Sequence, residues 1–213
     1  MSHHDDFNFE PVRGLPEALP EDEHIIWQGS PDPGRLAREA LGIRWVAGYF
    51  ILLVIWRFGV STTEYSLGMS ALHAVPFVIA GLLACGIIYG IAYVQARSAV
   101  YTLTNKRVAM RIGAALTMTL NLPYNWIGNA NADIKPSGHG TIAFELIGQD
   151  RLSYLMTWPH VRPWKMARTQ PALRCIPDAA KVAQMFAEAA ETRVAQPQLS
   201  RINEGGSDAV AAE

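Results

Sequence analysis

Charged residues are scarce in this chain of 213 residues, where Asp, Glu, Lys and Arg make up only 17%. They are absent from Ala71 to Val94, an unbroken run of uncharged and mostly apolar side chains. A helix rising about 1.5 Å per residue over this run is long enough to cross a hydrocarbon layer of roughly 30 Å. Its distance from the N-terminus and the lack of a small-x-small cleavage site exclude a signal peptide. A buried core helix is the alternative, although core helices are usually shorter and have a polar face.

Cysteine is also rare, because the chain has only Cys85 and Cys175. Cys85 lies within the apolar run and Cys175 far outside it, so we expect neither a disulfide nor a metal-ligand pair. Both are expected to be small apolar packing residues. The sequence also lacks a GxSxG motif, an HExxH motif and a phosphate-cradling glycine loop. We therefore expect no catalytic residue, no metal site and no enzyme activity.

A second apolar segment, Leu41–Val60, precedes the first. Its charge-free centre is short, but Arg44 and Arg57 bracket it, and their long side chains can reach the two membrane interfaces. A re-entrant or interfacial helix is the alternative. The link at 61–70 carries only Glu64, whereas basic residues flank the outer ends of both segments. The positive-inside rule therefore predicts a transmembrane helical hairpin with both termini in the cytoplasm.

The charge of the chain is unevenly distributed along its length. Residues 1–44 hold nine acids and four bases, a net charge of −5, whereas residues 97–195 hold twelve bases and six acids, a net charge of +6. A basic domain tethered to a membrane suits an anionic lipid surface, where each nearby base contributes about 1 kcal/mol. An acidic protein partner would suit it as well. We expect no nucleic-acid partner, because the bases are spread out and the chain is anchored.

Beyond the apolar segments the hydrophobic period changes to two. Apolar and polar residues alternate strictly over 116–122 and again over 141–146, which is typical of half-buried strands. Shorter runs that fit strands are Val100–Thr104, Val108–Ile112, Leu152–Met156 and Leu173–Ile176. Asp178 then precedes a helix with one apolar stripe. We expect six or seven short antiparallel strands closed by this C-terminal amphipathic helix.

The predicted organisation has four parts. They are an N-terminal cytoplasmic segment (1–40), the helical hairpin (41–96), a β-rich cytoplasmic domain (97–195) and a mobile tail (196–213).

Two motifs support a resemblance to bacterial pleckstrin-homology (PH)-like domains. YTLTNKRVAMRIG, from Tyr101 to Gly113, resembles a strand-turn-strand motif of these domains, which often follow a pair of transmembrane helices. EDEHIIWQGSPDP, from Glu21 to Pro33, resembles the segment that precedes the membrane helices in that family, with Asp22-Glu23 in place of Gly-Glu. The resemblance implies a membrane α-helical hairpin plus a cytoplasmic PH-like antiparallel β-sandwich or barrel, capped by a C-terminal α-helix.

Two further segments, Leu122–Ile134 and Leu155–Ala179, resemble photosynthetic complex assembly proteins of the PuhB type. This resemblance implies a two-pass protein of the inner (intracytoplasmic) membrane of a purple phototrophic bacterium. Its role would be to assist assembly of the photosynthetic reaction centre and light-harvesting antenna, whose subunits would be its partners. The alternative is a membrane-anchored PH-like module that binds anionic lipid or another protein.

The most unusual segment runs from Trp158 to Lys165 and contains two prolines, which exclude a continuous helix or central strand. Trp and Arg are common at binding surfaces, and Trp also settles at membrane interfaces. We expect partner or membrane-interface contacts from Trp158, His160, Arg162, Trp164, Lys165 and Arg168. The alternative is a loop whose tryptophans fill the open end of the sheet.

Lys106, Arg107 and Arg111 are candidate contacts for anionic lipid, with a solvated strand face as the alternative. His73, near the outer end of the second apolar segment, is a candidate ligand for the magnesium of bacteriochlorophyll. The alternative is a histidine that faces water or a backbone carbonyl, and we expect no other cofactor. Gly86 and Gly90 form a small-xxx-small pattern that permits close helix packing. They are expected to pack against the first segment or against another subunit, including a second copy.

Overall fold

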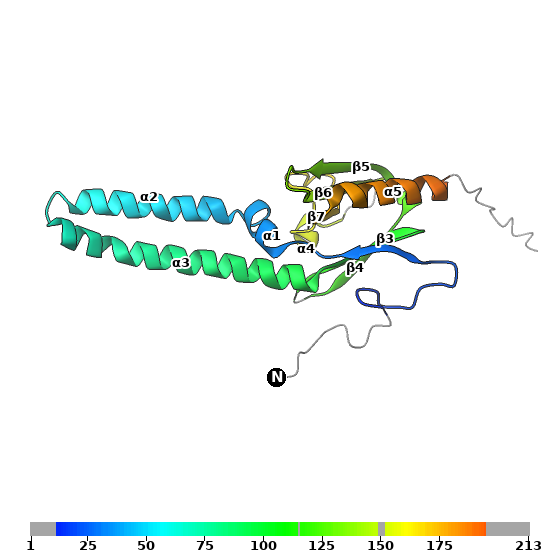
Figure 1. Cartoon of the computed structure of the whole chain (residues 1–213), viewed down its shortest axis with the longest axis horizontal. Helices are drawn as coiled ribbons and strands as arrows, with labels where there is room; N and C mark the ends of the chain where they lie inside the picture. The colour runs from blue at the N-terminus through cyan, green and yellow to red at the C-terminus, as the bar shows by residue number, and fades with distance from the viewer. Residues whose placement is uncertain (1–11, 115, 149–151, 195–213) are drawn as a thin grey trace, which may run out of the picture.

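The computed structural model describes residues 12–114, 116–148 and 152–194 (Figure 1). Two long antiparallel helices project from one end of a β-rich domain (Figure 1). They are α2 (Ile43–Ser61) and α3 (Leu67–Ser98), of 19 and 32 residues. Both are long and apolar enough to cross a membrane. Each prediction of an apolar helix is confirmed, and α3 extends beyond the predicted run at both ends.

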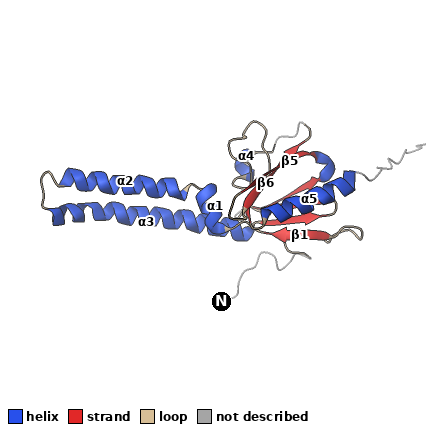
Figure 2. Cartoon of the chain, turned by 45° about the horizontal axis from the view of Figure 1, so that its top comes forward, coloured by secondary structure: helices blue, strands red, loops and turns tan. Residues whose placement is uncertain are grey.

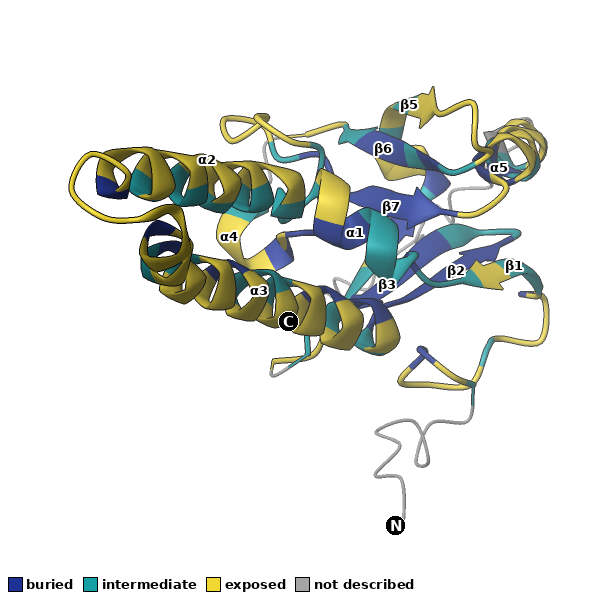
Figure 3. Ribbon diagram, turned by 60° about the vertical axis from the view of Figure 1, so that its left-hand side comes forward, coloured by how far each residue is buried: buried dark blue, intermediate teal, exposed yellow. Residues whose placement is uncertain are grey.

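The apolar side chains of α2 and α3 face outward over most of their length. None of the most apolar part of α2 and only 6% of that of α3 is buried (Figure 3). The most exposed large apolar residues of the pair include Trp45, Leu52, Leu67 and Leu82. A helix in the core of a soluble protein would bury such side chains, so the alternative of a buried core helix does not fit.

Within the described residues, seven strands form two antiparallel sheets, and Figure 2 draws the strands in red. The first sheet, in the order β1-β2-β3-β4, contains β1 (Ile25–Gly29), β2 (Val100–Thr104), β3 (Arg107–Ile112) and β4 (Met118–Pro123). The second contains β5 (Ile127–Ile134), β6 (Gly140–Leu146) and β7 (Ala172–Ile176). A single 3-10 turn, η1 (Tyr124–Trp126), joins the two sheets.

The hydrophobic core lies between the sheets and is covered by α5 (Ala179–Val194). Val182, Phe186 and Ala189 of this helix pack against buried residues of both sheets, including Phe144. The predicted C-terminal helix with one apolar stripe is therefore confirmed, and it begins directly after Asp178 as expected.

The first strand comes from the N-terminal side of the helical hairpin. Ile25 of β1 pairs with Thr104 of β2, and Gly29 pairs with Tyr101. The hairpin is thus an insertion between two neighbouring strands of one sheet. The predicted boundary at residue 97 leaves β1 out of the β-rich domain. The sequence did not show β1 because its five residues have no alternating pattern and its partner strand lies beyond both apolar helices.

Two further strand expectations need correction. The sequence predicts a strand over Leu152–Met156, but the segment overlaps α4 (Tyr154–Thr157), a single helical turn in which the Thr157 amide donates to the Ser153 carbonyl. Conversely, β5 was not predicted, because its residues include Gly, Asn and Asp, which are depleted in strands. Its pairing with β6 along nearly its whole length overrides that local preference.

A short helix, α1 (Pro33–Glu39), connects the hairpin to the sheets. Its Leu36 and Ala37 are buried against Ala92 and Ala96 of α3 and against Cys175 of β7. The amide of Asp32, which caps α1, donates to the carbonyl of Cys175 at 2.9 Å. These contacts fix the base of the hairpin to the second sheet.

Candidate functional site

The β-rich domain has two ends that differ in their distance from the hairpin. β2 begins two residues after the last residue of α3, and its Val100 pairs with Arg111 near the end of β3. The residues described between β3 and β4 (113–114 and 116–117) therefore lie at the end of the domain that carries the hairpin, here called the hairpin end. The turn between β2 and β3, at Asn105-Lys106, lies at the opposite end, here called the far end.

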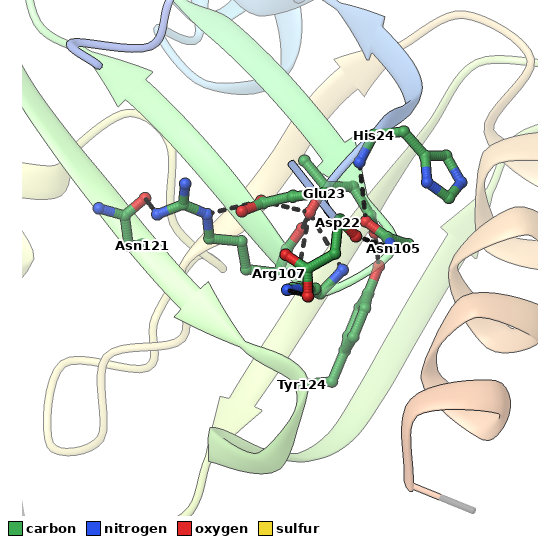
Figure 4. A network of polar contacts seen from close by, with 9 residues as sticks. Asp22, Glu23, His24, Asn105, Arg107, Asn121 and Tyr124 are labelled. Atoms are coloured by element: carbon green, nitrogen blue, oxygen red, sulfur yellow. Dashed lines mark hydrogen bonds and ion pairs between the residues drawn. The ribbon is translucent and has the colours of Figure 1, made fainter. Parts of the chain in front are cut away.

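A polar network at the far end joins the N-terminal segment to the β2–β3 turn (Figure 4). The buried carboxylate of Glu23 accepts hydrogen bonds from the Thr104 hydroxyl and from Nε of Arg107, both at 2.8 Å. Arg107 also donates to the Asn121 side chain at 3.2 Å. Polar residues of the two motifs at 21–33 and 101–113 therefore bind one another.

The neighbouring residues of the turn extend this network. Oδ1 of Asn105 accepts the His24 amide at 3.0 Å, and Nδ2 of Asn105 donates to the Asp22 carbonyl at 2.9 Å. Lys106 forms an ion pair with Asp22, and its hydrogen bond holds the pKa of that carboxyl below the ordinary value. Asp22 stays mostly exposed, so this pair is weaker than that of Glu23.

These contacts do not favour lipid binding by Lys106 and Arg107, which stays a prediction. Both side chains are paired with acids, and both lie at the far end of the domain, away from the hairpin. Arg111 does lie near the hairpin end, but its side chain is buried within the domain. The sequence could not show this, because Arg107 and Glu23 are separated by 84 residues.

His160 is fully buried rather than exposed. Its Nδ1 lies 2.6 Å from the Tyr101 hydroxyl, and the two rings meet edge to face. Burial lowers the pKa of His160 to about 3, and the charge of Arg174 acts in the same direction. The expectation that His160 contacts a partner is therefore wrong. The histidine instead holds the loop against Tyr101 of β2, and Tyr101 lies three residues after the end of α3.

The loop that follows His160 is closed at its base and open at its tip. Arg162 donates to Gln170 twice, from its amide to the carbonyl at 2.9 Å and from its side chain to Oε1 at 3.1 Å. Val161 forms an isolated bridge with Pro171. The tip between these contacts exposes Trp164, Lys165, Met166 and Arg168. Trp164 is 88% exposed, so it does not fill the open end of the sheets, whereas Trp158 is only partly exposed.

The loop borders a groove of about 640 Å³, and the other residues that line this groove locate the loop in the fold. Arg162 and Pro163 line it together with Glu39, the last residue of α1, and with Lys135 and Arg174. Because α2 begins four residues after Glu39, the loop tip lies beside the start of the hairpin. α4, with exposed Leu155 and Met156, lies at the same end (Figures 1 and 2).

Leu116 is a further exposed apolar residue at this end, in the turn between β3 and β4. We call these side chains together the hairpin-end surface. It consists of Leu116, Leu155, Met156, Trp164, Lys165, Met166 and Arg168.

His73 lies at the opposite tip of the hairpin. Its Nδ1 is 2.6 Å from the hydroxyl of Ser61, the last residue of α2, and its ring meets Tyr65 edge to face. These contacts leave Nε2 as the remaining nitrogen for any ligand. Pigment ligation by His73 stays a prediction.

Three glycines of α3 differ in what they face. A Cβ built on Gly81 would lie 2.8 Å from the Cβ of Phe50 in α2, so Gly81 allows the two helices to approach closely. A Cβ on Gly86 or Gly90 would meet no described atom within 4 Å. At 3.6 residues per turn these two glycines lie about 140° and 180° around the helix from Gly81. Packing of Gly86 and Gly90 against the first apolar helix is therefore contradicted, and contact with another subunit stays a prediction.

Comparison with known proteins gives a family and one full-length relative. A model of the bacterial PH domain family matches residues 40–190. A protein of Rhodobacter capsulatus, described as an uncharacterized 23.7 kDa protein in the puhA 5′ region, is 41% identical over 215 residues, and the match covers 100% of each chain.

Two solved structures show more distant likenesses. A DUF1696 family protein with a pleckstrin-homology domain from Shewanella loihica is 13% identical, with a TM-score of 0.29, over 43% of this chain and 71% of that one. The N-terminal PH domain of Vps36 is 13% identical, with a TM-score of 0.32, over 48% of this chain and 68% of that one.

Proposed function

The chain belongs to the bacterial PH domain family, and from this premise we propose that it is a non-catalytic, membrane-anchored assembly factor. Its clients would be subunits of the photosynthetic reaction centre and the light-harvesting antenna. The observation that carries the proposal is the full-length relative described by its place in the puhA 5′ region, which suggests a photosynthesis-gene context. The resemblance of the segments at 122–134 and 155–179 to photosynthetic assembly proteins points to the same context.

The proposed topology is a two-pass anchor in a bacterial inner membrane with both termini in the cytoplasm. Because β1 and β2 pair in one sheet, both ends of the hairpin start from the same domain and hence from the same side of a bilayer. Arg35 and Arg38 precede the hairpin, Arg44 lies at the start of α2 and Arg97 in the last turn of α3, whereas the link at the tip carries Glu64. The positive-inside rule then favours the cytoplasm for the β-rich domain.

In the proposed mechanism the protein acts as a scaffold. The exposed apolar sides of α2 and α3 would present a lateral surface to the membrane helices of a client. Gly86 and Gly90 lie on the open side of α3, where the absence of a side chain lets another helix backbone approach closely. The β-rich domain would hold this hairpin at the cytoplasmic face through α1.

Deletion of the gene in its phototrophic host tests the proposal. We expect the amount of assembled reaction centre to fall while pigment synthesis continues, and the intact gene to restore assembly. Affinity purification of the full chain in mild detergent should also recover a reaction-centre or antenna subunit. Normal levels of both complexes in the deletion strain would contradict the proposed role.

The hairpin-end surface favours a second candidate function, a lipid-binding module without a photosynthetic client. Its large apolar side chains and its bases are exposed together, which suits an anionic membrane surface. Headgroup-selective binding by the purified chain, with no photosynthetic subunit recovered from the host, would favour this function over the first.

A pigment-carrying role, by contrast, depends on His73. It would require an absorbance band of bound bacteriochlorophyll in the purified protein and the loss of that band in His73→Ala.

A further inference from the structure

We propose that residues 154–168 enter the headgroup layer of the bilayer that the hairpin crosses. In this arrangement Leu155, Met156, Trp164 and Met166 lie among the lipid headgroups. The inference rests on the membrane anchoring in the proposed function, and it is independent of any photosynthetic client. It assigns a lipid contact to the β-rich domain itself, at the connection between β6 and β7.

The first observation is the exposure of four large apolar side chains close together in the sequence. Leu155 is 86% exposed, Met156 68%, Trp164 88% and Met166 63%. Single exposed apolar residues are normal on protein surfaces, whereas several together mark an interaction surface or a membrane contact. Two of them lie on α4 and two at the tip of the following loop, so both segments contribute to the surface.

The second observation is that the structure holds these residues at the base of the hairpin. The loop is tied to β2 through the hydrogen bond between His160 and Tyr101. Arg162 and Pro163 share a groove with Glu39, which lies four residues before α2. The loop tip is thus next to the place where the chain leaves the domain for the membrane.

The third observation is the charge of this region. Residues 152–177 contain four bases and no acid. Lys165 and Arg168 are exposed beside the apolar side chains, so they can meet lipid phosphates while Trp164 occupies the headgroup region. Trp45 and Arg44 repeat this combination at the start of α2, and Trp45 is among the most exposed residues of the hairpin. A bilayer that surrounds the start of α2 therefore also reaches the loop beside it.

Tryptophan fluorescence of the full chain can test the inference. The protein is reconstituted into vesicles of phosphatidylcholine and phosphatidylglycerol, with or without brominated acyl chains, which quench only nearby indoles. Of the six tryptophans, Trp164 and Trp126 are both exposed, but Trp126 lies in η1, next to the β2–β3 turn at the far end. Trp164→Phe and Trp126→Phe are therefore matched variants, each of which removes one exposed indole.

The emission of Trp164 is the difference between the parent and Trp164→Phe, and that of Trp126 is the difference between the parent and Trp126→Phe. We expect brominated lipid to quench the emission of Trp164 and to leave the emission of Trp126 unchanged. The emission that remains in both variants includes Trp45 and Trp56 of α2 and reports on the hairpin. If that emission is not quenched, the membrane anchoring itself fails. If it is quenched while the Trp164 component is not, the anchoring stands and the lipid contact of the loop is overturned.

A second measurement separates lipid from protein as the occupant and tests the role of charge. Lys165→Gln combined with Arg168→Gln should reduce quenching of Trp164 in vesicles that contain phosphatidylglycerol and change it little in pure phosphatidylcholine. Equal quenching of this double variant and the parent in both vesicles would overturn the headgroup contact. If the emission of Trp164 shifts to the blue only after a client protein is added, and not with lipid alone, the surface binds protein instead of lipid.

Discussion

At the scale of single residues, the pair of Glu23 and Arg107 has the most evident structural role. The Glu23 side chain is only 3% exposed and that of Arg107 28%, so the pair is largely shielded from water. Buried charges of this kind are tolerated only when they are paired and hydrogen-bonded. Glu23 meets that condition through Thr104 and Arg107. It thereby joins the segment that leads into β1 to the paired strands β2 and β3.

Glu23→Ala should lower the free energy of unfolding by about 2–4 kcal/mol, because Arg107 and Thr104 lose their acceptor while the guanidinium stays partly buried. Chemical denaturation of the detergent-solubilised protein measures this loss. Asp22→Ala is the matched control, since Asp22 is mostly exposed and its ion pair with Lys106 contributes little. Equal effects of the two substitutions would contradict a special role for the buried pair.

His160 should make stability depend on pH. Burial lowers its pKa from 6.5 to about 3 in the folded state, so below pH 6.5 the unfolded chain binds a proton that the folded chain does not. Stability should therefore fall as the pH falls from 6.5 towards 3, by up to about 1.4 kcal/mol per pH unit from this group.

The comparison of His160→Gln with the parent isolates this contribution from the other titrating groups. Glutamine keeps a polar group near the Tyr101 hydroxyl but does not titrate, so the variant should have a shallower pH profile over that window. His139→Gln, at a half-buried histidine between β5 and β6, is the control for the loss of an imidazole elsewhere in the domain. Identical profiles for all three proteins would show that the folded state can protonate His160 without cost.

At the scale of the elements, the two sides of α3 have different surroundings. One side packs on α2 through Gly81, and the other side, with Gly86 and Gly90, is open. A side chain at Gly81 must displace Phe50 at its Cβ, which is attached directly to the backbone and cannot move away alone. Side chains at the other two positions meet nothing within the described chain.

Gly81→Ala should therefore destabilise the hairpin by about 1–3 kcal/mol through overpacking. Gly86→Ala and Gly90→Ala should not lower the thermal unfolding temperature in detergent, because a Cβ at either position meets no described atom. The larger double change Gly86→Leu with Gly90→Leu should also fold normally, but it should reduce recovery of a client or of a second copy from the membrane. Gly48→Leu, at an open glycine of α2, serves as the control for added bulk. Full recovery with the double variant would exclude this side of α3 as a contact.

The sequence predicted the elements that carry a long or regular pattern. The two apolar helices and the amphipathic α5 were recovered because their patterns extend over many residues. β1 was missed because a five-residue strand without alternation can be recognised only through its partner, and that partner follows the hairpin. β5 was missed because its local preferences oppose a strand, and only pairing with β6 makes it one.

The same distinction applies to the candidate site. Prolines and tryptophans correctly indicated an irregular segment, and Trp164, Lys165 and Arg168 are exposed on it. The burial of His160 depends on Tyr101, which is 59 residues away, and no local pattern reveals such a contact. The apolar side chains of α4 were expected in a strand, so their contribution to the hairpin-end surface appeared only in the structure.

At the scale of the whole molecule, the β-rich domain cannot be separated from the N-terminal segment. Residues 97–194 alone lack β1 and Glu23, and they expose the edge of β2 that β1 covers. We expect this fragment to aggregate and to show no cooperative unfolding, because an open sheet edge invites association.

A shortened chain tests this expectation. Residues 12–30 joined to residues 100–194 through Asn-Gly should fold, because Gly29 and Tyr101 are already paired and a two-residue turn suits such a hairpin. The joined chain should be soluble and unfold in one transition, as followed by circular dichroism. A fragment 97–194 that unfolds as sharply as the joined chain would show that β1 is dispensable.

The placement of the hairpin between β1 and β2 has a consequence for biogenesis. During synthesis β1 leaves the ribosome first and has no partner until Tyr101 has followed. In a bilayer the two strands cannot meet when one helix alone has crossed, since a single crossing would leave Gly29 and Tyr101 on opposite faces. A closed sheet therefore excludes a half-inserted hairpin, and half-inserted copies would expose the unpaired edge of β2 to association with other chains.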